Sequence, residues 1–296
     1  MNKLTEIVTS IAPELGEFEN KLKNIVKDEN FLKDYLVDFL FSNPKRLRPI
    51  LIYLFAKVLN INSKEVDYIA LSTELIHSAS LIHDDIIDEA KLRRNKQSFY
   101  DKFGSKKAVL EGDYLLSLSL VTLSKVNIDT VKIFSKKIKE TILGELNQNS
   151  NLNKIQSVEE YITKTLAKTT SLFVAGVESL FSLKEVDKTT KKAILDFMKN
   201  YSIAFQIKND IDNILKENAS DLKFGNYTLP VIYFCLDKNV EQVDVKQFNL
   251  EKEKYILKSS ETMENYKNLA IKVIENIEAS IYKKEIIELC EYSLRS

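Results

Sequence analysis

Apolar residues recur at helical spacing along nearly the whole chain, and the alternation that is typical of strands is scarce. Leu71, Leu75 and Ile82 illustrate this spacing, which places side chains on one face of a helix. Clusters of turn-forming and capping residues interrupt the pattern and predict helix ends at 42–44, 60–63, 103–105, 149–151, 184–189 and 224–226. The pattern therefore predicts an all-α protein of about ten or more helices.

The composition also favours a helical fold. The 296 residues include 6 Gly and 4 Pro, too few for the many turns of a β-sandwich, a β-barrel or a Rossmann sheet. Hydrophobic residues make up 44% of the chain, so a large core can be buried. No repeat, low-complexity tract or shift in composition divides the chain, and we therefore expect one all-α domain over residues 1–296.

The charge balance and the cysteines indicate the setting in which the protein works. Lys and Arg total 43 and Asp and Glu total 43, so no global field attracts nucleic acid, and we expect no nucleic-acid partner. Cys235 and Cys290 have no paired spacing, which predicts two reduced, buried thiols. The apolar stretches fall short of the ~18 residues that a spanning helix needs, and no apolar leader begins the chain. We expect a cytoplasmic protein without a transmembrane segment.

Acidic residues and two histidines, His77 and His83, interrupt an apolar helix predicted over residues 73–90. At about 100° per residue, His77, Asp84 and Asp88 project within about 20° of one another. Carboxylates one turn apart repel unless a cation lies between them, and Mg²⁺ typically takes one or two carboxylates together with water and phosphate. A solvated acidic face is the alternative, although Ile86-Ile87 argues against exposure. The stripe is thus a candidate magnesium site.

Basic residues lie on either side of this acidic helix. Lys45, Arg46 and Arg48 open a helix upstream, and Arg93-Arg94 follows the acidic motif by one turn. A helix start with Lys and Arg favours phosphate, because free N–H groups, the helix dipole and charged donors converge there. Either basic cluster alone is more typical of a solvated surface patch. Together with the acidic stripe, they predict a site for magnesium and diphosphate.

These motifs closely resemble the trans-polyprenyl diphosphate synthases, which are class I isoprenoid synthases. The resemblance covers roughly residues 43–230 and continues through the segments 110–116, 144–148, 168–170 and 204–207. It implies a single-domain helical bundle around a central apolar cavity, and a homodimer packed through helices. Many separate motifs agree in order and spacing, so the resemblance is specific.

The resemblance also implies a role for each matching residue, and two or three Mg²⁺ ions as the cofactor. The carboxylates at the metal on the allylic diphosphate are Asp84 and Asp88, with Asp85 in support. The residues implied for isopentenyl diphosphate are Lys45, Arg48, His77 and Arg94. The residues implied at the allylic diphosphate are Arg93, Lys168 and Gln206, with Thr169 beside it.

The activity implied is that of a prenyltransferase. It is the Mg²⁺-dependent, head-to-tail condensation of isopentenyl diphosphate with geranyl, farnesyl or geranylgeranyl diphosphate, which gives a longer all-trans polyprenyl diphosphate. Ionisation of an allylic diphosphate leaves a delocalised cation and a multiply charged leaving group, so metal ions and basic side chains must stabilise that anion. No side-chain nucleophile is required, in agreement with the lack of a Ser-His-Asp or Cys-His arrangement.

The second acidic motif of the family departs from its pattern in this chain. The family has Asp-Asp-x-x-Asp where this chain has 209–213, with amides at the metal-facing positions Asn209 and Asn213 and an aspartate at Asp210. Neutral amide oxygens bind Mg²⁺ less well than carboxylates do. The family's diphosphate-binding lysine before Thr-Leu-Pro is replaced by Asn226. We expect the third metal site and the second diphosphate contact to be weakened.

Two alternatives to chain elongation remain open. Asn209, Asn213 and Glu217 are similar in spacing to the second metal motif of class I terpene cyclases, so a cyclase is one alternative. The other is a catalytically weak subunit of a hetero-oligomeric prenyl synthase. The complete set of isopentenyl diphosphate residues favours elongation, because a cyclase binds a single diphosphate.

Two small residues bear on product length. In this family, bulky residues four and five positions before the first Asp close the elongation tunnel, and here those positions are Ser80 and Ala79. The resemblance therefore implies an open tunnel and a long product, of the octaprenyl kind. Ala and Ser are also ordinary helix-packing residues, which is the alternative interpretation.

Overall fold

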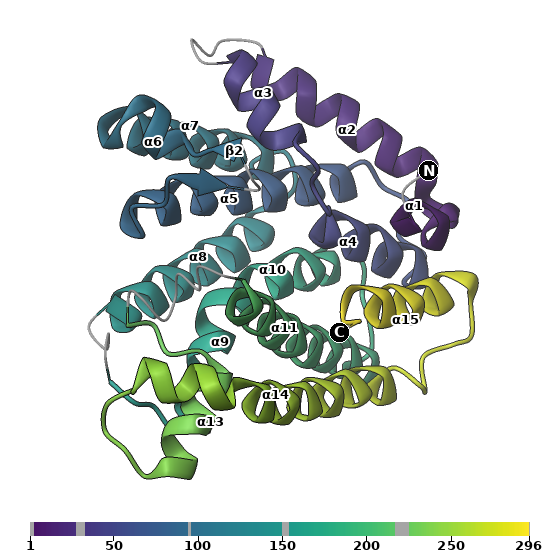
Figure 1. The fold of residues 1–296 in the computed structure, drawn as a ribbon. Helices are drawn as coiled ribbons and strands as arrows, with labels where there is room; N and C mark the ends of the chain where they lie inside the picture. The colour runs from purple at the N-terminus through teal and green to yellow at the C-terminus, as the bar shows by residue number, and fades with distance from the viewer. Residues whose placement is uncertain (1–2, 28–32, 94–95, 150–153, 217–224, 296) are drawn as a thin grey trace. The chain divides into compact units, whose positions relative to one another are not determined.

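The computed structural model describes residues 3–27, 33–93, 96–149, 154–216 and 225–295, and their regular structure is almost entirely helical (Figure 1). The α-helices are α1 (Lys3–Ile7), α2 (Ala12–Lys27), α3 (Lys33–Phe41), α4 (Leu47–Val58), α5 (Glu65–Ile87), α6 (Phe99–Phe103), α7 (Ser105–Leu123), α8 (Ile128–Asn149), α9 (Val158–Thr165), α10 (Ser171–Ser179), α11 (Lys188–Leu215), α13 (Leu229–Lys238), α14 (Val245–Val273) and α15 (Ile281–Ser293). Shorter elements are the 3-10 turns η1 (Thr9–Ile11) and η3 (Leu180–Ser182) and the π-helical segment η2 (Leu166–Thr170). The prediction of an all-α protein with ten or more helices is confirmed.

One small sheet was not predicted from the sequence pattern. Strands β1 (Leu92–Arg93) and β2 (Lys96–Gln97) pair antiparallel directly after the acidic motif. Leu92 lies opposite Gln97, and Arg93 lies opposite Lys96. Two residues per strand are too short to give a period-2 signal, so helical periodicity alone does not reveal this pair.

Helix ends lie at or beside the breaks predicted at 42–44, 60–63, 103–105 and 184–189, whereas the ends of α5, α7, α13 and α14 were not predicted. Asn43 and Asn60, which follow α3 and α4, adopt left-handed backbone angles with φ of 49° and 53°. Gly104, between α6 and α7, has φ of 78° and ψ of 163°, a conformation that glycine adopts at no steric cost. The breaks predicted at 149–151 and 224–226 lie partly outside the described residues.

The described residues form two compact units, and each has its own core. The first unit comprises residues 1–134, 175–185 and 280–285. Its longest packed pair is α5 against α7, and α4 is enclosed by η1, α2 and α5. Because helices surround α4, every residue of 49–56 is buried. A helix that is apolar on all sides is typical of such a central position.

The second unit comprises residues 135–174, 186–279 and 286–296. Its long helix α11 packs lengthwise against α14, and α13 also contacts α14. Phe197 and Tyr201 stack in the core of this unit with ring centroids 5.8 Å apart, and Phe173 meets Tyr201 edge to face. The prediction of a single domain over residues 1–296 stays a prediction.

The two cysteines are buried and not joined in a disulfide, as predicted. Burial raises the pKa of Cys235 to about 11 and that of Cys290 to about 12, so both thiols stay protonated near neutral pH. In the described part of the chain, no helix combines the length and the apolar character needed to cross a membrane.

Candidate active site

The acidic motif lies at the C-terminal end of α5. The helix ends at Ile87, and Asp88 caps it with its backbone N–H donating to the Asp84 carbonyl at 2.8 Å. This hydrogen bond continues the helical geometry, so the side chains of Asp84 and Asp88 keep the one-turn relation that the sequence predicted. Asp84 is half-buried and Asp88 is exposed. Solvent therefore reaches Asp88 and, in part, Asp84.

Exposure at this helix end differs from the expectation. Ile87 is 48% exposed, so the inference that Ile86-Ile87 keeps this end buried is wrong for Ile87. The reason is that α5 stops here: Glu89 turns the chain with a left-handed φ of 46°, and no further turn of helix covers Ile87. The buried residue at this helix end is instead Asp85, whereas its neighbour Asp84 is half-buried.

Asp85 has a different environment from Asp84 and Asp88. Its carboxylate is buried and accepts hydrogen bonds at Oδ1 from Arg93 Nε at 2.8 Å and from Arg93 Nη2 at 2.5 Å. Burial raises the pKa of Asp85, and the Arg93 guanidinium opposes this shift. The β1–β2 ladder fixes the backbone that carries Arg93. Asp85 thus holds the predicted diphosphate residue Arg93 in place.

The predicted isopentenyl diphosphate residues Lys45 and Arg48 flank a buried arginine that the sequence analysis did not assign. Arg46 precedes α4 with a left-handed φ of 51°. Its guanidinium donates to Glu74 at 2.6 Å and to Glu19 at 2.8 and 3.0 Å. Arg46 thereby anchors the segment to two carboxylates, while Lys45 is exposed and Arg48 half-buried. A lone Glu at 74 among apolar residues was a usable signal, because a buried carboxylate needs a cation.

The other predicted residues of α5 lie along the same helix. His77 is half-buried, and its carbonyl accepts a hydrogen bond from Ser80 Oγ at 2.7 Å. Ala79 is buried, at 3% exposure. His83, next to the acidic motif, packs on α7 so closely that a Cβ at Gly112 would come within 2.2 Å of His83 Nε2. This contact explains the glycine in the 110–116 motif: α5 and α7 approach each other there.

In the second unit, the predicted residues Lys168 and Thr169 lie on the π-helical segment η2. This segment continues α9, which begins with a capping box between Ser157 and Glu160. Segments of π-helix inside α-helices occur frequently at functional sites. Lys168 forms an ion pair with Glu145, and Thr169 Oγ1 donates to Gln206 Oε1 at 2.8 Å. Glu145 lies in the 144–148 motif, so three of the resembling segments meet here.

Asp210 forms the centre of a buried hydrogen-bond network on α11. Its Oδ1 accepts from Gln206 Nε2 at 2.8 Å, and its Oδ2 accepts from the Tyr161 hydroxyl at 2.7 Å. The backbone N–H of Leu229, at the start of α13, approaches the same Oδ2 at 3.4 Å. Burial and the neighbouring carboxylate raise the pKa of Tyr161, so its phenol stays protonated and donates. A chain of hydrogen bonds therefore runs from Tyr161 through Asp210 and Gln206 to Thr169.

Tyr161 was missed in the sequence analysis. It lies seven residues, about two helical turns, before Lys168, and therefore on the same side of the α9–η2 segment. That spacing was a signal, but its partner Asp210 is 49 residues away along the chain. Only the packing of α9 on α11 brings the two together.

The amide positions of the second motif differ from Asp210 in exposure. Asn209 is exposed and Asn213 is half-buried. Asp212 binds Lys208 Nζ at 2.5 Å on another side of the helix. The predicted residues Arg94 and Glu217 lie outside the described residues.

The carboxylates of the acidic motif suit a hard cation that takes its remaining ligands from water and from substrate phosphates. Among the residues that the structure describes, no group of three or more His, Cys, Asp and Glu side chains is arranged to hold a metal ion. Magnesium does not need such a group, since it usually keeps several waters and binds one or two carboxylates together with substrate phosphates. Asp84 and Asp88, one turn apart and accessible, fit that mode of binding.

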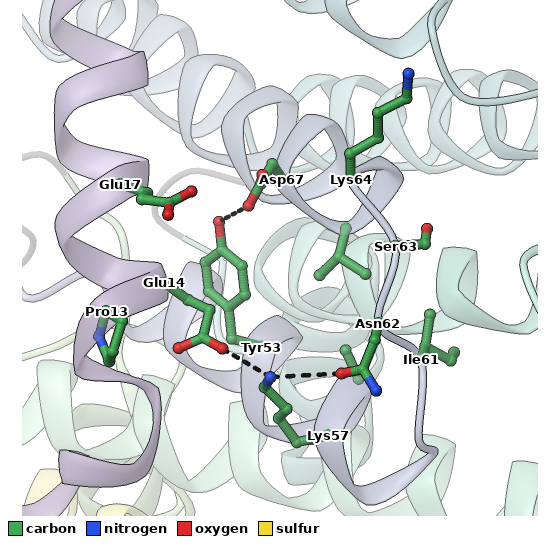
Figure 2. A pocket seen from close by; sticks show the side chains of 12 residues that line it. Pro13, Glu14, Glu17, Tyr53, Lys57, Ile61, Asn62, Ser63, Lys64 and Asp67 are labelled. Carbon is green, nitrogen blue, oxygen red and sulfur yellow. Dashed lines mark hydrogen bonds and ion pairs between the residues drawn. The ribbon is translucent and has the colours of Figure 1, made fainter.

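A pocket of about 310 Å³ lies at the opposite end of α5 (Figure 2). The Tyr53 hydroxyl donates to Asp67 at 2.7 Å there, and Lys57 pairs with Glu14 at 2.7 Å. Asp67 precedes Asp84 by 17 residues, or about 26 Å along a helix. None of the predicted site residues lines this pocket, so it is distinct from the acidic motif.

Known proteins that resemble the chain agree with the motifs. The family model described as Polyprenyl synthetase matches residues 29–268. A prenyl transferase of Cyanophora paradoxa is 32% identical, with 99% of each chain covered. The human all-trans-polyprenyl-diphosphate synthase is 30% identical over 94% of this chain and 74% of its own length. In fold, a polyprenyl synthase from Caulobacter crescentus, solved with calcium and isoprenyl diphosphate, superposes with a TM-score of 0.88 at 20% identity, over 98% of this chain and 97% of its own.

The family model covers well over half of the chain, and curated relatives align over nearly all of it. The motif resemblance is therefore confirmed. The chain belongs to the polyprenyl synthetase family and is a prenyltransferase.

Proposed function

We propose that the protein condenses isopentenyl diphosphate with an allylic diphosphate, head to tail, and releases a longer all-trans polyprenyl diphosphate. The observation that carries this proposal is the end of α5, where Asp84 and Asp88 lie one turn apart and Arg93 is held by Asp85. The allylic substrates expected are geranyl, farnesyl and geranylgeranyl diphosphate. The cofactor proposed is Mg²⁺, with two or three ions.

In the first unit, Asp84 and Asp88 would bind magnesium on the allylic diphosphate, and Arg93 would donate to its oxygens. Lys45, Arg48, His77 and Arg94 would bind isopentenyl diphosphate, and the buried Arg46 supports the segment that carries the first two. When bound, magnesium supplies positive charge that stabilises the departing diphosphate.

In the second unit, Lys168, Thr169 and Gln206 would contact the allylic diphosphate. Asp210 accepts hydrogen bonds from both Gln206 and Tyr161, so its contribution would be to orient Gln206. Asn209 and Asn213, with Glu217, would offer a metal site weaker than that of the family's carboxylates, because two of its oxygens are neutral amides.

The reaction needs only these binding groups. The C–O bond between the allylic carbon and its diphosphate breaks, and the double bond of isopentenyl diphosphate forms a new C–C bond to that carbon. The proton that the isopentenyl unit then loses goes to the released diphosphate, so no side chain has to act as the base. Preorganised basic side chains stabilise the charge that develops on the leaving group, which is commonly the largest contribution to such a rate enhancement.

One assay tests the proposal against both alternatives. The protein is incubated with labelled isopentenyl diphosphate, farnesyl diphosphate and Mg²⁺, and the products are separated by chain length. A longer linear diphosphate is the expected product. A cyclic hydrocarbon or alcohol, with diphosphate released and no label incorporated, would indicate a terpene cyclase. The absence of any product would indicate a subunit that needs a partner synthase.

Product length is proposed to be of the octaprenyl kind. The proposal depends on the small side chains of Ala79 and Ser80, which would leave an elongation tunnel open in the central apolar cavity expected from the family. Ala79→Phe should shorten the products, with Ser80→Ala as the matched control that adds no bulk. An unchanged ladder of products in Ala79→Phe would contradict the tunnel argument.

We also propose a cytoplasmic homodimer. Helix α7 supports a helical interface, since Leu110 is 68% exposed and Val121 is 59% exposed in the single chain. The molar mass from light scattering tests the dimer: a value near twice 34.1 kDa is expected, and a value near 34.1 kDa would contradict it.

A further inference from the structure

A buried arginine joins three helices of the first unit at the start of α4. The Arg46 guanidinium donates from Nη1 to Glu74 Oε1 on α5 at 2.6 Å, and from Nε and Nη2 to Glu19 on α2 at 2.8 and 3.0 Å. Nη2 also donates to the Leu40 carbonyl, in α3, at 2.9 Å. These hydrogen bonds use four of the five N–H donors of the guanidinium.

Water is nearly excluded from the ion pair between Arg46 and Glu74. Their side chains are 7% and 5% exposed, and the ring centroids of Phe18 and Phe41 lie 5.7 and 5.2 Å from the guanidinium carbon. Burial alone would lower the pKa of Arg46, whereas the carboxylates of Glu74 and Glu19 raise it above its ordinary value, so the guanidinium stays charged. Separation of this pair would leave an unpaired charge in an apolar environment, so the pair has few alternative arrangements.

The ion pair connects two parts of the chain that carry residues proposed to bind isopentenyl diphosphate. Lys45 directly precedes Arg46, and Arg48 lies in the first turn of α4, whose first backbone hydrogen bond is accepted by the Arg46 carbonyl at 3.0 Å. On α5, Glu74 precedes His77 by three residues, or about 4.5 Å along the helix axis. Movement within the ion pair would therefore change the distance between the basic segment 45–48 and His77.

The backbone of this segment depends on the side chain of Arg46. Arg46 has a φ of 51°, in the left-handed region that residues with a Cβ seldom adopt. The contacts with α2, α3 and α5 hold the residue in that conformation. Because its guanidinium is buried and bonded on several sides, Arg46 is placed to orient its neighbours and not to bind a substrate itself.

We infer that Arg46 and Glu74 are positioning residues, whose ion pair holds the segment 45–48 at the distance from His77 that one isopentenyl diphosphate can bridge. The inference rests on the proposed function, which assigns this segment and His77 to that substrate. Replacement of a buried ion pair by apolar residues is often neutral for stability. What the pair contributes here is a fixed geometry between α4 and α5.

Replacing the pair by two apolar side chains tests the inference. Arg46→Met/Glu74→Met removes both charges, so no buried carboxylate is left alone at position 74. Glu74→Gln is a milder second variant, which leaves the bonds of Arg46 with Glu19 in place. Lys57→Met is the matched control: Lys57 pairs with Glu14 at 2.7 Å and also joins α4 to α2, but at the other end of α4. Circular dichroism and the Tm of each variant establish that it is folded.

Calorimetry of the full-length protein in Mg²⁺ buffer, without an allylic substrate, measures the affinity for isopentenyl diphosphate. The double variant should bind it about tenfold more weakly and Glu74→Gln about threefold more weakly, because the binding groups remain but are misplaced. In steady-state assays, KM for isopentenyl diphosphate should rise by the same factors. KM for farnesyl diphosphate and kcat should stay within about threefold of wild type, since Arg93 is held separately by Asp85. Lys57→Met should change none of these values.

Wild-type affinity in both the folded double variant and Glu74→Gln would overturn the inference. An equal rise in KM for both substrates would overturn it as well, because the pair would then support the fold in general.

Lys45→Met and Arg48→Met separate this inference from the proposed function. If both of these variants bind isopentenyl diphosphate as the wild type does, the proposed binding site is wrong and the inference falls with it. If they bind it more weakly while the double variant at positions 46 and 74 does not, the proposed site stands and only the role of the ion pair is overturned.

Discussion

The two acidic motifs of the family lie near the C-terminal ends of α5 and α11. The aspartate at the second position of each motif, Asp85 on α5 and Asp210 on α11, has the same kind of environment. Asp85 is buried and bonded by Arg93, and Asp210 is buried and bonded by Tyr161 and Gln206. Each of these carboxylates accepts hydrogen bonds from a residue predicted to contact diphosphate. In both motifs, the aspartate at the second position therefore orients a neighbouring hydrogen-bond donor.

The two regions differ at the positions beside those aspartates. On α5, the accessible positions 84 and 88 are carboxylates, whereas on α11 the corresponding positions 209 and 213 are amides. The buried aspartate is thus retained in both regions, whereas the first and last positions of the motif are carboxylates only on α5. Under the proposed function, α5 would therefore supply most of the anionic ligand charge for magnesium.

The largest effect is expected from removing that charge. Asp84→Asn should lower kcat about a hundredfold or more, because an anionic ligand for the cation that stabilises the leaving group is replaced by a neutral one. Radiolabelled elongation assays at saturating Mg²⁺ measure it. Asp212→Asn is the control, since Asp212 pairs with Lys208, and it should change the rate little. An Asp84→Asn rate within threefold of wild type would mean that α5 is not the main metal site.

Restoring charge on α11 should have a smaller effect in the opposite direction. The double variant Asn209→Asp/Asn213→Asp should lower the Mg²⁺ concentration for half-maximal activity by roughly three- to tenfold, because neutral ligands become anionic. A titration of activity with Mg²⁺ measures it. Asn200→Asp, earlier on the same helix, is the control. An unchanged titration curve would mean that the amides at 209 and 213 do not weaken magnesium binding relative to carboxylates.

A third variant tests the buried network around Asp210. Tyr161→Phe should lower the free energy of unfolding by about 1–3 kcal/mol, because it removes a donor from a buried carboxylate. Urea unfolding monitored by circular dichroism measures this change. Tyr255→Phe is the matched control: its hydroxyl bonds to Asp237 at 2.7 Å, a carboxylate that water still reaches, so a loss of about 0.5 kcal/mol is expected. Equal losses of unfolding free energy in the two variants would mean that burial of Asp210 does not make its hydrogen bond with Tyr161 more stabilising.

The smallest effect concerns the pH dependence from Asp85. Its pKa is raised above the ordinary 3.8 in the folded protein, so the folded state holds a proton that the unfolded state has already lost. Its contribution to stability is therefore present below pH 3.8 and is lost as the pH rises through the folded-state pKa.

Asp85→Asn removes this titration. The unfolding free energy of the variant relative to wild type should therefore rise as the pH increases above 3.8. Urea midpoints at a series of pH values provide the measurement. A difference that is flat or falls with pH would show that Arg93 outweighs burial at Asp85.

Local patterns predicted much of this molecule. The helical period, the scarcity of Gly and Pro, and turn residues such as Asn43 and Asn60 were sufficient for an all-α fold and for several of its helix ends. The one-turn relation of Asp84 and Asp88 followed from helical geometry, even though Asp88 lies just beyond the end of the helix. These features depend on residues close together in the chain, for which spacing is informative.

Other features of the site were beyond such patterns. Arg46 pairs with Glu19 and Glu74, which are 27 and 28 residues away, and Lys164 meets Asn226 across 62 residues. The π-helical geometry at Lys168 likewise has no signature in helical periodicity, because one extra residue per turn changes the spacing only locally. No spacing rule relates residues that are 27, 28 or 62 positions apart in the chain, as in the contacts of Arg46 and Lys164.

The amino-acid sequence by itself determined the helical class, the order of the motifs and which residue types each motif offers to magnesium and diphosphate. Tertiary structure alone decided which carboxylates serve a structural role and which are accessible, as the contrast between Asp85 and its neighbour Asp84 shows. The physical reason is that burial and hydrogen bonding depend on what distant segments pack against a residue, whereas helix formation depends on its near neighbours.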